Sequence, residues 1–244
     1  MKIELQGLTK TFDSLRALDR VRLEIEPGQI VAVVGANGAG KSTLLRCLSG
    51  IVGATEGLIF FDQEEFQRDR VDLRRRLMFL PDFPYMFTEK TALEHIGLVL
   101  RAYEADQPGV EERVISLLRE FDLLAIATQP LNILSRGQRY KSALIALLAI
   151  DPELWLLDEP MASGMDPHGI NSFKREALAA VRRGRTIIYT TQILELAEKF
   201  SDRVCVIHKG EARAFDTASQ LKTDASGKAG SLEAIFDQLR GEGG

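Results

Sequence analysis

The sequence has few cysteines and no long hydrophobic run. Its 244 residues include 2 cysteines, Cys47 and Cys205, which stand far apart among apolar neighbours. This implies neither a disulfide framework nor a cysteine metal site, so we expect both as small buried side chains in a reducing compartment. The longest unbroken apolar run, Ala143 to Ile150, is well short of the roughly 20 residues of a membrane span. We therefore expect a cytosolic protein.

An excess of positive charge is also missing. Lysine and arginine number 31 against 35 aspartates and glutamates, which gives a formal net charge of −4. A protein that holds nucleic acid mainly through phosphate contacts needs a basic surface, so we expect no nucleic-acid partner. The 3 histidines show no metal-ligand spacing, and we expect two of them, His95 and His168, at the surface or at helix ends.

A glycine-rich segment of the pattern G-x-x-x-x-G-K-[ST] lies between the apolar run Ile30 to Val34 and Leu44. This order predicts a strand, a loop and the start of a helix. Glycines let successive backbone N–H groups curl around an anion, and the helix N-terminus adds the positive end of its dipole. A plain glycine turn would need neither Lys41, which we expect on the β and γ phosphates of a nucleotide, nor Ser42, which we expect on Mg²⁺. The predicted binding residues are Gly35, Ala36, Asn37, Gly38, Ala39, Gly40, Lys41, Ser42 and Thr43.

A second apolar run, Leu154 to Leu157, ends in Asp158 and Glu159. Burying unpaired charge is costly, so two adjacent acids at the end of a buried strand favour a cation or a reacting water beside them. We expect Asp158 to hold Mg²⁺ through water and Glu159 to act as the base that polarises the attacking water. The alternative is a strand-to-turn junction that the two acids cap.

Strand-like and helical patterns alternate along the chain. Apolar runs at Thr186 to Thr190 and Val204 to Ile207 follow the two runs above, and the alternation favours an α/β fold with a mostly parallel sheet. Residues 93–103 and 110–121 instead carry apolar residues at helical spacing, which predicts an inserted helical lobe. Residues 221–244 are polar and small for much of their length, and we expect them as a peripheral tail.

Beyond these patterns, the sequence from Leu8 to Gly210 resembles the nucleotide-binding subunits of ABC transporters. The resemblance depends on Leu134-Ser135-Arg136-Gly137-Gln138, which resembles the signature loop of that family, and on the segment Leu154 to Pro160. It implies a P-loop NTPase core with an antiparallel β portion near the N-terminus and an inserted helical subdomain. The implied ATPase domain covers residues 1–220, with the core over about 1–82 and 152–220 and the helical subdomain over about 83–151.

By this resemblance the chain is an ATPase subunit that binds ATP and Mg²⁺ and energises a membrane transporter. In this family two cassettes close on two ATP molecules, so Ser135, Gly137 and Gln138 would face the nucleotide of the opposite subunit. Phe12 would stack on adenine, unless it is a core side chain at a strand end. The chain would lie on the inner face of the membrane through a transmembrane permease subunit. Residues 231–236 are similar to the endings of exporter subunits.

An aromatic segment, residues 83–87, has two possible roles. It would border the groove that receives a cytoplasmic helix of the permease, or it would seal the junction between core and lobe.

Four positions depart from the family pattern. Asp82 stands where the family has a glutamine near Mg²⁺, and a carboxylate there is still a suitable metal ligand. Arg136 replaces a signature glycine and could approach phosphate or point to solvent. The loop from Met161 to Asp166 is one residue longer than usual. Gln192 replaces a histidine and cannot carry positive charge, so we expect hydrolysis to be impaired more than binding.

These departures leave two alternatives open. The chain could be a weakly hydrolysing regulatory cassette that pairs with an active one in a heterodimer. It could also be a soluble ABC protein that acts on ribosomes or DNA, although such relatives typically carry two cassettes or a coiled-coil arm, and this sequence shows neither.

Overall fold

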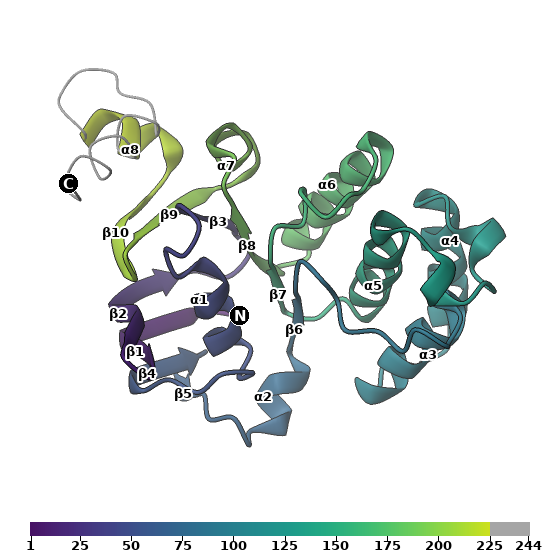
Figure 1. Ribbon diagram of the computed structural model, residues 1–244, viewed down its shortest axis with the longest axis horizontal. Coiled ribbons are helices and arrows are strands. Elements are labelled where there is room, and N and C mark those ends of the chain that lie inside the picture. Colours follow the sequence, from purple (N-terminus) through teal and green to yellow (C-terminus); the bar gives the residue numbers. More distant parts are fainter. Residues whose placement is uncertain (225–244) are drawn as a thin grey trace.

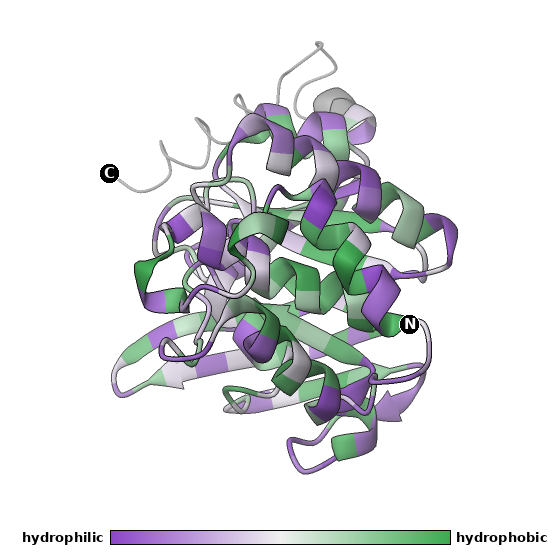
Figure 2. Ribbon diagram, turned by 90° about the vertical axis from the view of Figure 1, so that its right-hand side faces the viewer, coloured by the Kyte–Doolittle hydropathy of each residue, from purple (hydrophilic) through white to green (hydrophobic). Residues whose placement is uncertain are grey.

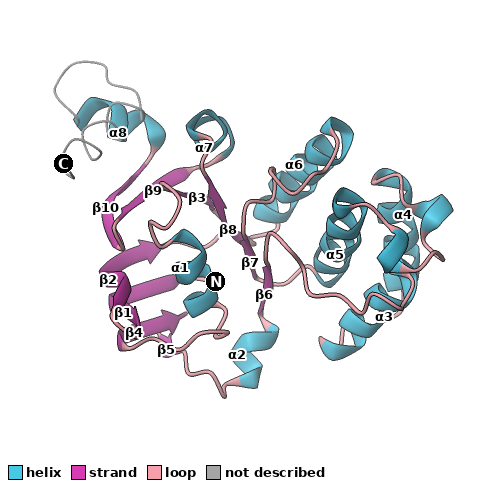
Figure 3. Ribbon diagram, in the orientation of Figure 1, coloured by secondary structure: helices cyan, strands magenta, loops and turns pink. Residues whose placement is uncertain are grey.

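Strands and helices alternate to build two sheets, as a computed structural model describes for residues 1–224 (Figure 1 and Figure 3). The larger sheet has six strands. All neighbouring strands run parallel except β9 and β10, which pair antiparallel at one edge. In spatial order they are β10 (Glu211–Asp216), β9 (Arg203–His208), β3 (Ile30–Val34), β8 (Thr186–Thr191), β7 (Leu154–Leu157) and β6 (Leu77–Leu80). Every residue of β3, β7 and β8 is buried, as expected for parallel strands covered on both faces.

The smaller sheet is antiparallel and lies near the N-terminus, which confirms that prediction. Its strands in spatial order are β2 (Leu15–Ile25), β1 (Ile3–Phe12), β4 (Glu56–Phe61) and β5 (Glu64–Glu65). The two sheets share an apolar core. Val31 and Val33 of β3 pack into this core with α1 (Lys41–Leu48), whereas Ala32 and Val34 face the helices on the other side.

The helices α3 (Ala92–Ala102), α4 (Val110–Glu120) and α5 (Arg136–Ile150) pack together beyond the β6 edge of the larger sheet (Figure 1). Most of α5 is buried, because α3 and α4 cover one side of it and the sheet lies on the other. Figure 2 shows hydrophobic stretches through the centre of the molecule and hydrophilic residues at its periphery. The three helices fall inside residues 83–151, while the bounds of that subdomain stay a prediction.

Within residues 1–224, five further α-helices lie outside this group. They are α1, described above, together with α2 (Val71–Arg75), α6 (Pro167–Arg182), α7 (Leu194–Phe200) and α8 (Ala218–Asp224). Two short 3₁₀ turns, η1 (Leu124–Ile126) and η2 (Leu131–Ile133), lie between α4 and α5. Residues 231–236 of the expected tail lie outside the described residues.

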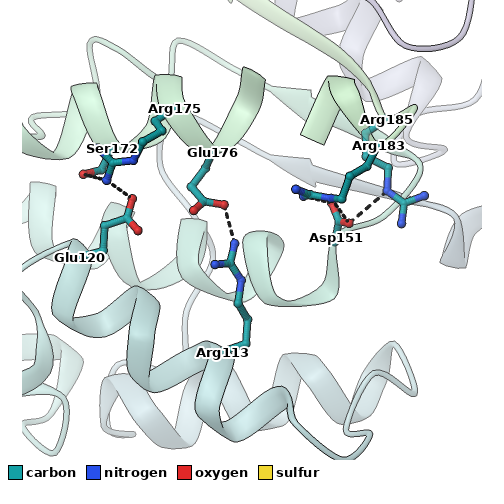
Figure 4. A network of polar contacts seen from close by, with 8 residues as sticks. All are labelled: Arg113, Glu120, Asp151, Ser172, Arg175, Glu176, Arg183 and Arg185. Atoms are coloured by element: carbon teal, nitrogen blue, oxygen red, sulfur yellow. Dashed lines mark hydrogen bonds and ion pairs between the residues drawn. The ribbon is translucent and has the colours of Figure 1, made fainter. Parts of the chain in front are cut away.

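Ion pairs join α6 to the helical group (Figure 4). Arg113 of α4 pairs with Glu176 of α6 at 2.5 Å, and Arg175 of α6 pairs with Glu120 of α4 at 2.7 Å. A third contact is made by Asp151, which accepts hydrogen bonds from Arg183 and Arg185 beyond the C-terminus of α6. These pairs hold α4 and α5 to α6, which follows directly on the loop after β7.

Two predictions about single residues have opposite outcomes. Cys47 and Cys205 are both buried, as expected, and burial raises the pKa of their thiols to about 11 and about 12. The surface position expected for His95 is wrong, because the residue is 4% exposed. It shares the buried face of α3 with Ala92 and Ile96, and burial lowers its pKa. Among the described residues, no helix combines the length and apolarity needed to span a membrane.

Candidate functional site

The glycine-rich loop follows β3 directly and leads into α1, as the sequence predicts. Gly38 and Gly40 have φ values of 78° and 111°, in the region that favours glycine. Side chains would also collide here: a Cβ atom at Gly40 would lie 2.6 Å from the carbonyl oxygen of Ala17, and one at Gly35 would lie 2.4 Å from that of Ile207. The loop is therefore held tightly between neighbouring segments at the carboxyl end of β3.

Lys41 lies inside this loop. Its ammonium donates hydrogen bonds to the carbonyl oxygens of Gly35 at 2.9 Å and Ala36 at 3.2 Å, and the residue is 6% exposed. Burial lowers the pKa of Lys41, whereas the nearby carboxylates of Glu159 and Asp158 act to raise it. The cation thus sits at the centre of the loop, where an anion bound by the backbone N–H groups would meet it.

Asp158, directly after β7, faces the start of α1. Its Oδ1 accepts hydrogen bonds from Ser42 Oγ at 3.0 Å and from Thr190 Oγ1 at 2.6 Å. A hydroxyl and a carboxylate are hard oxygen ligands, so this pair fits Mg²⁺. The described residues contain no cluster of three or more acidic, histidine or cysteine side chains that could hold a metal alone. A cation here would need water and phosphate oxygens to complete its shell.

Thr190 is a site residue that the motifs did not identify. Besides holding Asp158, its hydroxyl accepts a hydrogen bond from the backbone N–H of Glu159 at 2.9 Å. A threonine near the end of a buried strand, beside Thr191, is the only sequence signal for this role. It joins β8 to the acidic end of β7.

Glu159 has a strained backbone and a partly buried carboxylate. Its φ of 48° lies in the left-handed region, which is uncommon for a residue other than glycine. Burial raises the pKa of Glu159, and the ammonium of Lys41, 3.9 Å away, opposes that rise. The amide nitrogen of Gln192 lies 3.5 Å from its Oε1. Glu159, the predicted base, therefore faces both Lys41, the predicted phosphate ligand, and Gln192, which stands where the family pattern has a histidine.

One cavity of about 1110 Å³ brings these residues together. Its walls include Asp158, Glu159, Gln192 and Asp82, and from the glycine-rich loop and the start of α1 they include Asn37, Gly38, Gly40, Lys41, Ser42 and Thr43. The predicted binding residues Gly35, Ala36 and Ala39 are not part of the cavity wall. Phe12, at the end of β1, also lines the cavity; it is 41% exposed, and the Lys10 ammonium lies 4.8 Å from its ring centroid. The cavity is large enough for a nucleotide-sized ligand.

Ser135, Gly137 and Gln138 do not line this cavity. Ser135 caps α5, because its hydroxyl accepts the N–H of Gln138 at 3.2 Å while the Gln138 side chain accepts the N–H of Ser135 at 2.8 Å. Gly137 is packed so closely that a Cβ atom there would lie 2.1 Å from the carbonyl oxygen of Gly164. These residues form a second, separate part of the predicted site at the N-terminus of α5.

A family model for ABC transporters matches residues 18–162. The chain belongs to the ABC transporter family. It is 30% identical over 241 residues to the ABC-type transporter ATP-binding protein EcsA of Bacillus subtilis, covering 98% of this chain and 97% of that protein. It is 31% identical over 209 residues to the SkfA peptide export ATP-binding protein SkfE of the same species, covering 86% of each. Importers are similar too, among them the methionine import ATP-binding protein MetN of Haemophilus influenzae, at 34% identity over 90% of this chain and 66% of that protein.

Solved structures give the same assignment. The ATP-binding subunit of an ABC transporter matches with a TM-score of 0.92 and 27% identity over 98% of this chain and 100% of that one. The ATP-binding cassette MJ0796, in a dimeric post-hydrolysis state with ADP and phosphate, matches with a TM-score of 0.79 and 26% identity over 88% and 98%. The chain is therefore an ATPase with the fold of an ABC cassette, which confirms the predicted family, fold and enzyme class.

Asp82 and Arg136, two residues at which this ABC cassette departs from the expected family pattern, contact each other. The guanidinium of Arg136 pairs with Asp82 Oδ1 at 2.5 Å and lies 4.1 Å from the ring centroid of Phe83. The sequence left open whether Arg136 approaches phosphate or points to solvent. In the structure it turns back onto the loop after β6 of its own chain.

The loop from Met161 to Asp166, which we expected to be one residue longer than usual, is also bound within the chain. Ser163 is fully buried and donates a hydrogen bond to the carbonyl oxygen of Pro160 at 2.8 Å. Asp166 caps α6 by accepting the N–H of Gly169 at 2.7 Å, and it pairs with the buried Lys141 of α5 at 2.5 Å. The loop is thus anchored within the chain at Ser163 and at Asp166.

Proposed function

We propose that this chain is the ATP-binding and ATP-hydrolysing subunit of a membrane transporter, and that it works by closing with a second cassette on ATP. The observation that carries the proposal is the convergence of Lys41, Asp158 and Glu159 in one cavity, while Ser135 and Gly137 lie outside it. One chain thus carries the residues that bind phosphate, hold the metal and act as the base. It also presents a separate surface, the N-terminus of α5, to which the nucleotide of a second cassette can bind.

Within the cavity, the backbone N–H groups of the glycine-rich loop hold the phosphates and Lys41 neutralises them. Ser42 and Asp158 would hold Mg²⁺, with Asp82 as the third expected ligand, and the ion would neutralise charge on the phosphate oxygens. Phe12 stacks on the adenine ring. Glu159 orients the attacking water and accepts its proton, and Gln192 holds the Glu159 carboxylate through its amide.

A transmembrane subunit is the second partner we propose. Phe83, Tyr85 and Phe87 are 66%, 94% and 64% exposed, which is unusual for three aromatic side chains in one short loop. A groove of about 340 Å³ lies beside α2 and the C-terminal end of α3, and it is lined by apolar residues such as Phe79 and Tyr103 and by Arg74 and Arg75. A short amphipathic helix on the inner face of the membrane fits these surfaces. The similarity to a peptide export subunit over 86% of each chain supports export as the direction of transport.

Membrane recruitment tests this proposal. The full chain, expressed in its own cells, should sediment with membranes and purify in detergent with one integral membrane subunit. Phe87→Glu places a charge on the exposed aromatic loop and should release the chain from the membrane fraction while its ATP affinity stays unchanged, because Phe87, unlike Phe83 and Tyr85, does not line the nucleotide cavity. Equal membrane recovery of both proteins, or recovery of neither, would contradict the transport role.

A regulatory cassette in a heterodimer is the second candidate. It is favoured by Gln192, a neutral amide beside the base, and by Arg136 in place of a signature glycine. Sedimentation of the Glu159→Gln chain with ATP separates the two candidates. A monomer that pairs only with a different cassette supports the heterodimer, and a tight homodimer at micromolar concentration excludes it.

A further inference from the structure

The contact between Asp82 and Arg136 joins two elements that are 54 residues apart in sequence. Asp82 follows β6, and Arg136 is the first residue of α5. Besides the 2.5 Å ion pair, the guanidinium lies 4.1 Å from the Phe83 ring centroid, so it is held by a carboxylate and an aromatic face at once. The two side chains are 30% and 43% exposed, which leaves the pair partly screened by solvent.

Asp82 is exposed to the nucleotide cavity, whereas Arg136 is not. Asp82 lines the cavity together with Asp158 and Glu159, and all three are carboxylates. Burial is the main cause of the raised pKa of Glu159 and of the Tyr140 hydroxyl, and the charge of Asp82 adds to the rise at both residues. A carboxylate in this position repels the phosphates of a nucleotide unless a cation compensates it.

Arg136 reaches Asp82 from outside the cavity. It does not appear in the cavity wall, and its stem runs beside Gly164, where a Cβ atom would lie 3.8 Å from Arg136 Cδ. The side chain thus lies against the loop after β6, the start of α5 and the loop before α6, with 43% of it exposed. Because a guanidinium stays protonated at any physiological pH, it supplies a permanent positive charge on the far side of Asp82.

We propose that Arg136 is a positioning residue for nucleotide binding, which neutralises Asp82 from within the same chain and fixes the loop after β6 against α5. The two departures from the family pattern then act together, because the positive charge of Arg136 offsets the repulsion between Asp82 and the phosphates. This inference rests on the proposed nucleotide site around Lys41.

The test is the affinity for a fluorescent ATP analogue without Mg²⁺, measured by equilibrium titration. Arg136→Ala leaves Asp82 uncompensated and should weaken binding about tenfold, with a smaller loss at high salt. Asp82→Asn should bind at least as tightly as the parent. The double variant Asp82→Asn, Arg136→Ala should recover to within about twofold of Asp82→Asn, because the repelling charge is gone.

Two further variants guard the interpretation. Arg139→Ala removes the same charge from the same helix without touching the cavity wall, and it should leave the affinity unchanged. Arg136→Lys keeps the charge and should bind within about twofold of the parent even if Arg136→Ala fails to fold.

Three results would overturn the inference: unchanged binding by Arg136→Ala, a double variant as weak as Arg136→Ala, or a lysine variant as weak as the alanine one. If the parent chain itself binds no ATP analogue, the proposed nucleotide site fails instead.

Discussion

The amide nitrogen of Gln192, just after β8, lies 3.5 Å from the carboxylate of Glu159, just after β7. The contact places a neutral donor beside the proposed base. In the family resemblance a histidine stands at this position, and a histidine could both donate to the γ phosphate and exchange protons. Gln192 can do only the first.

Restoring the histidine should therefore speed hydrolysis. We expect Gln192→His to raise the steady-state ATPase rate by up to about 10²-fold, because the histidine adds the proton exchange that an amide lacks, and a general acid–base group contributes about 10²- to 10⁴-fold. ATP affinity should stay the same, because Lys41 and the loop N–H groups still hold the phosphates. The variant should also gain a pH dependence near neutrality that the parent lacks. An equal or lower rate would show that hydrolysis in this cavity does not need a proton-exchanging side chain at this position.

Lys41 should contribute most of the ATP affinity. It is buried with its ammonium on the carbonyl oxygens of Gly35 and Ala36, so Lys41→Ala removes the cation from a preformed anion site. We expect affinity to fall by about ten- to a hundredfold, the loss of a hydrogen bond to a charged group. Lys199→Ala is the matched control, since Lys199 is 72% exposed and pairs with Glu195 on α7. Isothermal titration of both variants tests this, and equal affinities would rule out the loop as the phosphate site.

As the pH is lowered, the rate of hydrolysis should begin to fall at a higher pH than it would with a base of ordinary glutamate pKa. A base works in its ionised form, and burial raises the pKa of Glu159. Protonation therefore begins at a higher pH than the usual value of about 4.3, and activity is lost as pH falls through the raised pKa. A pH profile of the single-turnover rate at saturating ATP measures it. A rate that stays flat down to the ordinary glutamate range would contradict Glu159 as the base.

Tyr140 and Tyr189 should respond oppositely to loss of their hydroxyls. Among the described residues, the buried Tyr140 hydroxyl has no hydrogen-bond partner, whereas the Tyr189 hydroxyl lies 2.8 Å from Ser201 Oγ. Tyr140→Phe should raise the free energy of unfolding by about 1 kcal/mol, and Tyr189→Phe should lower it by about as much. Urea unfolding of the two variants provides the comparison. A loss of stability in Tyr140→Phe would show that its hydroxyl has a partner in solution.

The sequence predicted what depends on local pattern. Residues 30–34 and 154–157 are strands at their predicted bounds, because each is a continuous apolar run that ends at a glycine or an acid. Helices α3 and α4 begin and end within one residue of their predicted ranges. The pattern around Lys41 likewise placed the loop between β3 and α1.

Contacts between distant segments could not be predicted in the same way. The pairing of Asp82 with Arg136, and the two hydrogen bonds of Thr190, arise only when strands β6, β7 and β8 and helix α5 are assembled. The burial of His95 was not predicted because the histidines were judged only by whether their spacing could bind a metal. Its place three residues after Ala92, next to Ile96, was the signal that it belongs to the apolar face of α3.

The role of Glu159 tests the account most directly. In the structure its carboxylate lies 3.9 Å from Lys41, so exchange to glutamine removes the base and leaves every expected phosphate contact in place. Single-turnover hydrolysis of radiolabelled ATP by the parent and by Glu159→Gln, at equal occupancy, is the decisive measurement. We expect the variant to bind ATP with unchanged affinity and to hydrolyse it at least about 10²-fold more slowly, as the loss of a general base requires. Hydrolysis at the parental rate would contradict the account.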